Sequence, residues 1–351
     1  MMRGMWFWIL WLVAAVSTGG AGGCSPIPMQ RFEYSRMLMG VRATVTLYSR
    51  HEHVAFDNAA AALDEIGRLE DILSDYQRNS EAAMLTAGPP GQWRDVSQEL
   101  WDVLDRSADL WHASGGLFDP TLGPQVALWR RARALRALPE AAEVEDARSR
   151  SGMQSLELRP GQVKLTKPGM KLDFGGIGKG YAAQRALDLL VARGSPMAMV
   201  AIAGDVAVGE PPPGERGWIV AVDSGQPRST PRLIRVRHRA VSTSGDTEQF
   251  VDIAGNRYAH IVDPRTGLGA TIRRSATVIA GAGWLADALG KPGVLGGREL
   301  VEALARRYHA AFIVTESDGT TSIEDPYRII EADQTRNEAT PAAPSRYPPV
   351  R

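Results

Sequence analysis

A glycine-rich stretch in the middle of the chain, Lys171–Tyr181 with the sequence KLDFGGIGKGY, places the strongest constraint on the local fold. Apolar and polar residues roughly alternate before it, in Gln162–Leu165 and Met170–Leu172, which is typical of β-strands. The residues after it, Tyr181–Val191, have the apolar spacing of an amphipathic helix that ends near Gly194. The sequence therefore predicts a glycine loop that joins a strand to the N-terminus of a helix.

Such a loop can bind an anion, because its exposed N–H groups and the helix dipole both favour negative charge. Lys179 adds a full positive charge at the same end, and Asp173 could accept hydrogen bonds from a nucleobase or ribose. The spacing matches neither of the familiar nucleotide-binding loops, G-x-x-x-x-G-K-[ST] and G-x-G-x-x-G. A tight turn that needs glycine only for its backbone dihedrals is the alternative interpretation.

The ends of the chain differ in composition from its middle. Arg3 precedes an apolar run, Trp6–Val16, which is too short to span a bilayer comfortably and is typical of an exported signal peptide. Cys24, the only cysteine, follows small residues as in a bacterial lipoprotein, although the usual leucine three positions earlier is absent. We expect residues 1–24 to be a leader, and the protein to be anchored by a lipid on Cys24 at the periplasmic side of a bacterial membrane. Ordinary signal cleavage is the alternative.

The rest of the composition indicates a folded protein with a short tail. The 351 residues carry no formal net charge, which argues against a nucleic-acid partner. No cysteine follows position 24, so an internal disulfide is excluded after it. Residues 331–351 contain four prolines among small and polar residues, which predicts a disordered tail and leaves residues 31–330 as the folded domain.

Periodicity predicts several further elements. The segment 127–147, rich in Arg, Ala and Glu, is expected to form two short exposed helices split near Pro139, with no function assigned to them. Other helices are expected over Ala55–Tyr76, over Ser97–His112 with Ser97 as N-cap, and from Gly283, and strands over Val41–Tyr48, Met197–Ala203, Trp218–Val222 and Ala276–Ala280.

Three more motifs carry polar residues in ordered turns. The first, SGGLFDPTLGP at 114–124, places Asp119 where it could hydrogen-bond a ligand. The second, AVSTSGD at 240–246, has hydroxyls that could hold phosphates or a bound peptide, with simple turn chemistry as the alternative. The third, HIVDPRTG at 260–267, contains His260, whose imidazole could act as a base near neutral pH.

These motifs, in this order, resemble those of the ApbE family, the FAD:protein FMN transferases. The resemblance covers roughly Met39 to Asp287 and begins with a Met-Gly pair, Met39-Gly40, that enters a strand. It implies an α+β fold: a mixed, largely antiparallel sheet core with outer helices, in one compact domain of two interlocked halves.

The resemblance also implies a reaction. FAD would bind with its pyrophosphate near Gly175–Lys179, and a threonine hydroxyl of a target flavoprotein would attack the phosphorus on the FMN side and release AMP. Mg²⁺ would bind at Asp287 and at a backbone oxygen near Gly176, and together with Lys179 it would neutralise the pyrophosphate. His260 would be the base for the hydroxyl, or it would pack its ring against the flavin. The residues implied to line the FAD site are Met39, Tyr76, Leu117, Phe118, Asp119, Asp173 and Ile261.

Two positions depart from the family pattern. Lys291 stands four residues after Asp287, where the family has a threonine that binds magnesium. Because a charged ammonium has only donors, either the metal has fewer protein ligands or Lys291 replaces part of its charge. Ala203 replaces the first glycine of a pair and could crowd a ligand. An FAD pyrophosphatase that yields FMN and AMP, and a non-catalytic FAD-binding lipoprotein, are the alternative functions.

Overall fold

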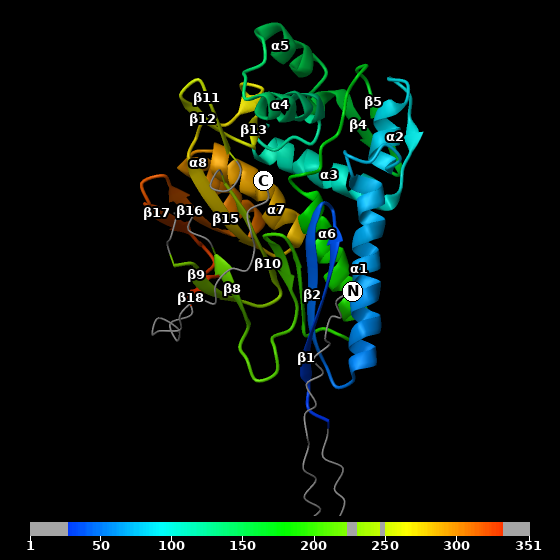
Figure 1. The fold of residues 1–351 in the computed structure, drawn as a ribbon, viewed down its shortest axis with the longest axis vertical. Coiled ribbons are helices and arrows are strands. Elements are labelled where there is room, and N and C mark those ends of the chain that lie inside the picture. The colour runs from blue at the N-terminus through cyan, green and yellow to red at the C-terminus, as the bar shows by residue number, and fades with distance from the viewer. Residues whose placement is uncertain (1–26, 223–229, 246–249, 333–351) are drawn as a thin grey trace, which may run out of the picture.

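The computed structural model describes residues 27–222, 230–245 and 250–332 (Figure 1). The expected leader with Cys24, Asp246 of the second motif and the expected tail beyond residue 332 lie outside the described residues. Within the described part, no helix combines the length and the apolar character needed to cross a bilayer.

An eight-stranded sheet forms the centre of the fold, and every strand pair among the described residues is antiparallel. The largely antiparallel core expected from the resemblance is confirmed, but no described pair is parallel, as a mixed sheet would require. In spatial order the strands are β1 (Gln30–Leu38), β2 (Val41–Ser49), β6 (Ala198–Ile202), β7 (Asp205–Val208), β10 (Arg239–Ser244), β15 (Arg274–Ala280), β16 (Ala311–Glu316) and β17 (Thr321–Glu324).

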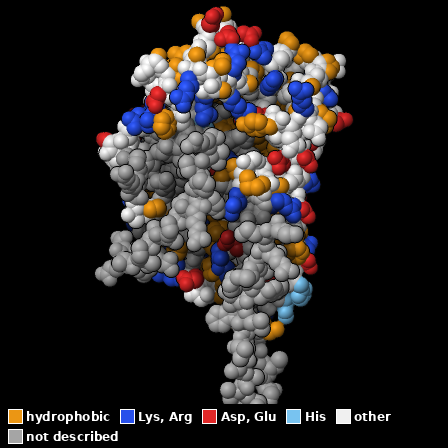
Figure 2. Space-filling view, viewed as in Figure 1, with side chains coloured by type: hydrophobic (Ala, Val, Ile, Leu, Met, Phe, Trp, Pro, Cys, Tyr) orange, Lys and Arg blue, Asp and Glu red, His pale blue; other side chains and the backbone are white. Residues whose placement is uncertain are grey.

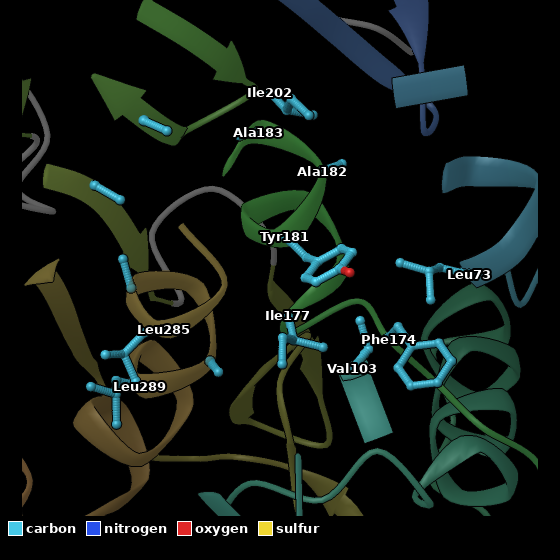
Figure 3. Close-up of a cluster of buried hydrophobic side chains, with 14 of the residues drawn as sticks. Leu73, Val103, Phe174, Ile177, Tyr181, Ala182, Ala183, Ile202, Leu285 and Leu289 are labelled. Carbon is cyan, nitrogen blue, oxygen red and sulfur yellow. The ribbon is translucent and has the colours of Figure 1, made fainter. Parts of the chain in front are cut away.

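Helices cover one face of this sheet (Figure 1). They are α1 (Glu52–Leu73), α6 (Gly178–Ala192), α7 (Gly283–Leu295) and α8 (Arg298–Tyr308). The start of α6 lies deep in this core, where Figure 3 shows Ile177 and Tyr181 between Leu285 of α7 and Leu73 of α1. Burial of this apolar layer fixes the N-terminus of α6, and with it the glycine loop, relative to the sheet.

A second, three-stranded sheet covers the opposite face. It consists of β18 (Glu331–Ala332), β9 (Arg232–Val236) and β8 (Trp218–Val222). The alternation of side chains along β16 shows the two faces, because Phe312 packs in the helical core and its neighbour Ile313 packs against the small sheet. Strand β18 lies within the segment that the sequence predicts to be a disordered tail, so residues 331 and 332 are in a strand and not in a disordered tail.

An upper layer sits at one end of the central sheet (Figure 1). Its helices are α2 (Glu81–Ala87), α3 (Gln98–Ala113), α4 (Gly123–Leu135), α5 (Ala141–Ser149) and a short 3-10 helix (Met153–Ser155). Its small sheet consists of β3 (Arg94–Asp95), β5 (Gln162–Leu165) and β4 (Leu156–Arg159). Two hairpins complete it: β11 (Phe250–Ile253) with β12 (Asn256–Ala259), and β13 (Val262–Asp263) with β14 (Leu268–Gly269). Ser97 caps α3 by accepting a hydrogen bond from the Leu100 N–H, as predicted.

Two sequence-based expectations about elements are wrong, and one strand was not predicted. Residues 170–172 form no strand, because this segment runs against the start of α4, where a Cβ on Gly123 would lie 2.6 Å from the Lys171 carbonyl oxygen. Helix α1 ends at Leu73 rather than Tyr76, because Ser74 is extended and its hydroxyl accepts hydrogen bonds from the next turn. Residues 30–38 form a strand, β1, that the sequence analysis did not predict.

Candidate functional site

A cavity of about 300 Å³ opens between the upper layer and the N-terminus of α6. All the predicted site residues except Met39 and Asp287 line it. Its walls come from the end of α1, the 117–122 turn, α4, the glycine loop, the 260–262 segment and α7: Tyr76, Leu117, Phe118, Asp119, Leu122, Val126, Trp129, Arg130, Arg133, Asp173, Gly175, Gly176, Lys179, His260, Ile261, Val262 and Lys291.

Arg130 of α4 joins the two sides of this cavity. Its guanidinium donates hydrogen bonds to Asp75, after α1, and to Oδ2 of Asp173, at 2.8 Å, before the glycine loop. The same group lies 4.4 Å from the centre of the Tyr76 ring, in a cation–π contact. Tyr76 is otherwise 75% exposed, so the contact with Arg130 orients its ring at the cavity wall.

Arg130 was not predicted, because the charged composition of segment 127–147 is typical of a solvated surface. A signal was available: Val126, Trp129, Arg130 and Arg133 follow the i, i+3, i+4, i+7 spacing of one helical face, and all four line the cavity. The expected pair of helices flanking Pro139 is confirmed as α4 and α5. Figure 2 shows Lys and Arg side chains gathered over the upper layer, around the place of α4 in Figure 1.

The two predicted ligand-binding carboxylates already have protein partners. Asp119 accepts hydrogen bonds from Thr121 and from the Met153 N–H, and burial raises its pKa above the usual value. Asp173 accepts from Arg130 and from the Gly175 N–H at 2.9 Å. Burial and the Asp75 charge raise the pKa of Asp173, and Arg130 opposes that rise. Both carboxylates therefore order the turns that line the cavity.

Two lysines and two buried aspartates form a charge cluster at the floor of the cavity. Nζ of Lys179 lies 3.0 Å from Oδ2 of Asp205 and 3.9 Å from Oδ2 of Asp287. Nζ of Lys291 lies 3.0 Å from the other oxygen of Asp287, Oδ1. The two lysines also line the cavity, so the charge cluster lies next to whatever binds there.

The charges of this cluster perturb one another. Asp287 and Asp205 raise the pKa of Lys179, although burial acts in the opposite direction. Burial would raise the pKa of Asp287, but Lys179 and Lys291 outweigh it and hold that pKa below its usual value. Burial and the Asp287 charge raise the pKa of Asp205, which also accepts a hydrogen bond from the Ser242 hydroxyl at 2.5 Å. Lys179 is thus held in the charged form.

A close crossing of α6 and α7 brings the cluster together. A Cβ on Gly180 would lie 2.2 Å from the carbonyl oxygen of Gly283 and 2.7 Å from Cβ of Asp287. Only glycine permits such an approach. It allows the Gly180 N–H to donate to Oδ2 of Asp287 at 3.1 Å, within the first turn of α6. The glycines that the sequence analysis assigned to anion binding therefore also position the buried aspartate.

The residues around Asp287 do not fit a magnesium ion. Asp287 is 1% exposed, its Oδ1 is paired with the Lys291 ammonium, and its Oδ2 accepts from the Gly180 N–H. A magnesium ion bound to Oδ1 at about 2.1 Å would lie within about 5 Å of that ammonium, with a repulsion of roughly 6 kcal/mol at an effective dielectric constant of about 20. Among the described residues, no three His, Cys, Asp or Glu side chains are grouped to hold an ion.

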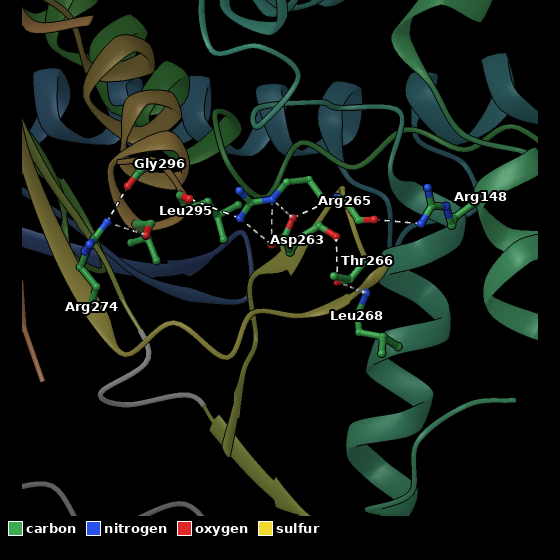
Figure 4. A network of polar contacts seen from close by, with 9 residues as sticks. Arg148, Asp263, Arg265, Thr266, Leu268, Arg274, Leu295 and Gly296 are labelled. Atoms are coloured by element: carbon green, nitrogen blue, oxygen red, sulfur yellow. Dashed lines mark hydrogen bonds and ion pairs between the residues drawn. The ribbon is translucent and has the colours of Figure 1, made fainter. Parts of the chain in front are cut away.

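His260 lies between two well-fixed neighbours. The indole N–H of Trp129 donates to the carbonyl oxygen of Ala259 at 2.9 Å, so α4 holds the backbone on one side of His260. On the other side Arg265 pairs with Asp263 and reaches the carbonyl oxygen of Leu295 at the end of α7 (Figure 4). This bracing keeps the half-buried imidazole at the cavity wall.

The remaining predicted positions lie away from the cavity wall. Met39 has a φ of 53° in the tight turn between β1 and β2, and its N–H donates to Glu70. Its side chain reaches the start of α6, where Cε lies 3.8 Å from the Cβ position of Gly178. Ala203 has a φ of 52° in the turn between β6 and β7 and is exposed, so it does not crowd the cavity. Thr243 of the second motif is paired with Thr277.

Comparison with known proteins connects this chain to one family. The sequence profile of the ApbE family matches residues 39–314. The FAD:protein FMN transferase of Treponema pallidum is 31% identical, over 89% of this chain and 93% of that protein. The enzyme of the same name from Vibrio cholerae is 27% identical, over 88% and 95%. The solved ApbE protein of Thermotoga maritima superposes with a TM-score of 0.76 at 26% identity, over 85% and 97%.

Proposed function

The chain belongs to the ApbE family and is an FAD:protein FMN transferase, and on this premise we propose how its cavity carries out the transfer. The observation that carries the proposal is the position of the glycine loop. Gly175, Gly176 and the ammonium of Lys179 lie together at the cavity wall, beside the N-terminus of α6. A helix N-terminus and a nearby ammonium both favour the binding of a pyrophosphate.

The flavin end of FAD is proposed to lie against Tyr76. Arg130 covers one face of this ring, and the rest of the ring is exposed to the cavity. Leu117, Phe118 and Ile261 supply the apolar contacts that a flavin ring system needs. Asp173 is proposed to act through Arg130, since its oxygens are already engaged.

The acceptor is proposed to be a threonine hydroxyl of a target flavoprotein. Its oxygen forms a bond to the phosphorus on the FMN side, and the bond from that phosphorus to the bridging oxygen breaks. AMP leaves with the electron pair, and His260 takes the hydroxyl proton. Transfer of this kind depends on positioning and on charge stabilisation rather than on covalent help from the protein.

Magnesium stays a prediction, and the residues around Asp287 do not favour it.

We also propose where in the cell the protein acts. The signal-like segment 6–16 followed by Cys24 supports export to the periplasmic side of a bacterial membrane and a lipid anchor there.

Mass spectrometry of an acceptor domain tests the proposed reaction. The purified chain is incubated with FAD and a threonine-bearing flavoprotein domain, and AMP is followed in parallel. We expect the acceptor to gain the mass of one FMN with one AMP released, and no gain when its threonine is replaced by valine. AMP without acceptor modification would indicate the pyrophosphatase, and bound FAD without AMP would indicate a binding protein; either result contradicts the proposal.

His260→Gln tests the proposed base. We expect the transfer rate to fall by about 10²–10⁴-fold with FAD affinity retained, because the proton acceptor is lost. His112→Gln is the matched control, since His112 is exposed at the end of α3 and does not line the cavity. Equal rates for the two variants would remove His260 from the mechanism.

A further inference from the structure

We propose that the ammonium of Lys291 takes the place of a divalent cation in this transferase, so that a lysine rather than a bound metal offsets the buried Asp287 charge beside the pyrophosphate of FAD. The inference rests on the proposed function and names the source of the positive charge at the same site. It starts from the position of Lys291, one helical turn after Asp287 on the same face of α7.

The position of the ammonium supports this assignment. Nζ of Lys291 is 3.0 Å from Oδ1 of the buried Asp287, and the lysine lines the cavity beside Gly176. A Cβ on Gly176 would lie 2.7 Å from Cε and 3.1 Å from Nζ of Lys291. The lysine therefore lies against the segment of backbone that was expected to help bind the metal, and a positive charge already occupies this region.

The charge balance supports it independently. Lys179 and Lys291 supply two positive charges, and Asp205 and Asp287 supply two negative ones. The charge cluster therefore has no formal net charge, and both of its lysines line the cavity. Without the Lys291 charge the cluster would carry a net negative charge next to a dianionic pyrophosphate, which would repel it.

A purely structural ion pair is the competing explanation, and the metal dependence of the reaction separates the two. FMN transfer is measured in EDTA and in excess Mg²⁺, for the native chain and for Lys291→Thr, Lys291→Met and Lys291→Arg. Lys164→Met is the matched control, because Lys164 forms an ion pair with Glu157 outside the cavity. Circular dichroism verifies that each variant is folded, and binding of FAD is measured separately by flavin fluorescence.

We expect the native chain and the Lys164→Met control to transfer FMN equally well in EDTA and in Mg²⁺. Lys291→Met should lose about 10²–10³-fold in rate in both buffers, as when a fixed charge-stabilising group is removed, and Lys291→Arg should stay active in EDTA. Lys291→Thr should be inactive in EDTA and recover at least about tenfold in Mg²⁺, because threonine offers an oxygen ligand. Loss of native activity in EDTA with recovery in Mg²⁺, or full activity of Lys291→Met, would overturn the inference.

Calorimetric titration with Mg²⁺ alone gives a second measurement that does not need turnover. We expect no binding to the native chain and binding to Lys291→Thr. If the native chain transfers no FMN in either buffer, the proposed function fails, and this titration still decides the inference. Magnesium binding by the native chain would refute it.

Discussion

Replacement of Gly180 by alanine tests the close crossing of α6 and α7 on which the charge cluster depends. The new Cβ would lie 2.2 Å from the Gly283 carbonyl oxygen and 2.7 Å from Cβ of Asp287. Neither neighbour is the flexible end of a side chain, so the two helices must separate by about 1 Å to restore an ordinary contact.

The magnitude follows from the cost of overpacking. Forcing an extra methyl group into a packed site costs typically about 1–3 kcal/mol, and the higher helix propensity of alanine returns at most about 1 kcal/mol. Because the obstructing atoms are rigid, we expect Gly180→Ala to lower the free energy of unfolding by about 2 kcal/mol. The separation also lengthens the Gly180 N–H to Asp287 hydrogen bond, now 3.1 Å, so FMN transfer should fall as well.

Urea unfolding followed by circular dichroism measures this effect. Gly67→Ala in α1 is the control, because a Cβ there would meet only Cδ2 of Leu38, at an ordinary 3.6 Å. We expect the control to be stabilised by up to about 1 kcal/mol. If Gly180→Ala unfolds at the same urea concentration as the native chain, the crossing is looser than described and the reasoning is refuted.

Two further predictions concern charged residues of the site. Arg130→Lys should raise the dissociation constant for FAD about tenfold, because lysine cannot bridge Asp75 and Asp173 while it covers the Tyr76 ring. Fluorescence titration with FAD measures this constant, and an unchanged value would contradict the prediction. Asp287→Asn should destabilise the chain more at pH 7 than at pH 3. The pKa of Asp287 is lowered in the folded state, so its contribution is present above the unfolded pKa of about 4 and is lost as the pH falls further. Urea midpoints at both pH values measure the difference, and an equal loss at both would contradict it.

The motifs allowed much of the cavity to be predicted, because they are local. The glycine loop, the 114–124 turn and the 260–267 segment each combine glycine or proline with polar residues, and these determine turn conformations over a few residues. Helix α6 and the Ser97 cap of α3 likewise depend on neighbours in sequence. Local interactions of this kind are visible in the order of residues.

The features that were not predicted depend on contacts between segments that are distant in the sequence. Arg130 became a site residue only because α4 packs across the end of α1 and the glycine loop. The alternation in Met170–Leu172 predicted a strand, yet it reflects burial of those side chains in a segment without a sheet partner. Strand β1 was missed because its register depends on the turn at Met39, where a methionine takes a backbone conformation that usually needs glycine or asparagine.

The charge cluster also has a consequence for the order of folding. Its parts are far apart in the chain, and the hydrogen bond from Gly180 to Asp287 closes a loop of 107 residues. Closing such a loop costs entropy before any contact is gained, whereas the β1–β2 hairpin and the helices need only nearby residues. We therefore expect the site to form among the last events of folding. A refolding chain should regain its circular dichroism spectrum before it regains FAD binding, so flavin fluorescence reports the completed molecule rather than its early intermediates.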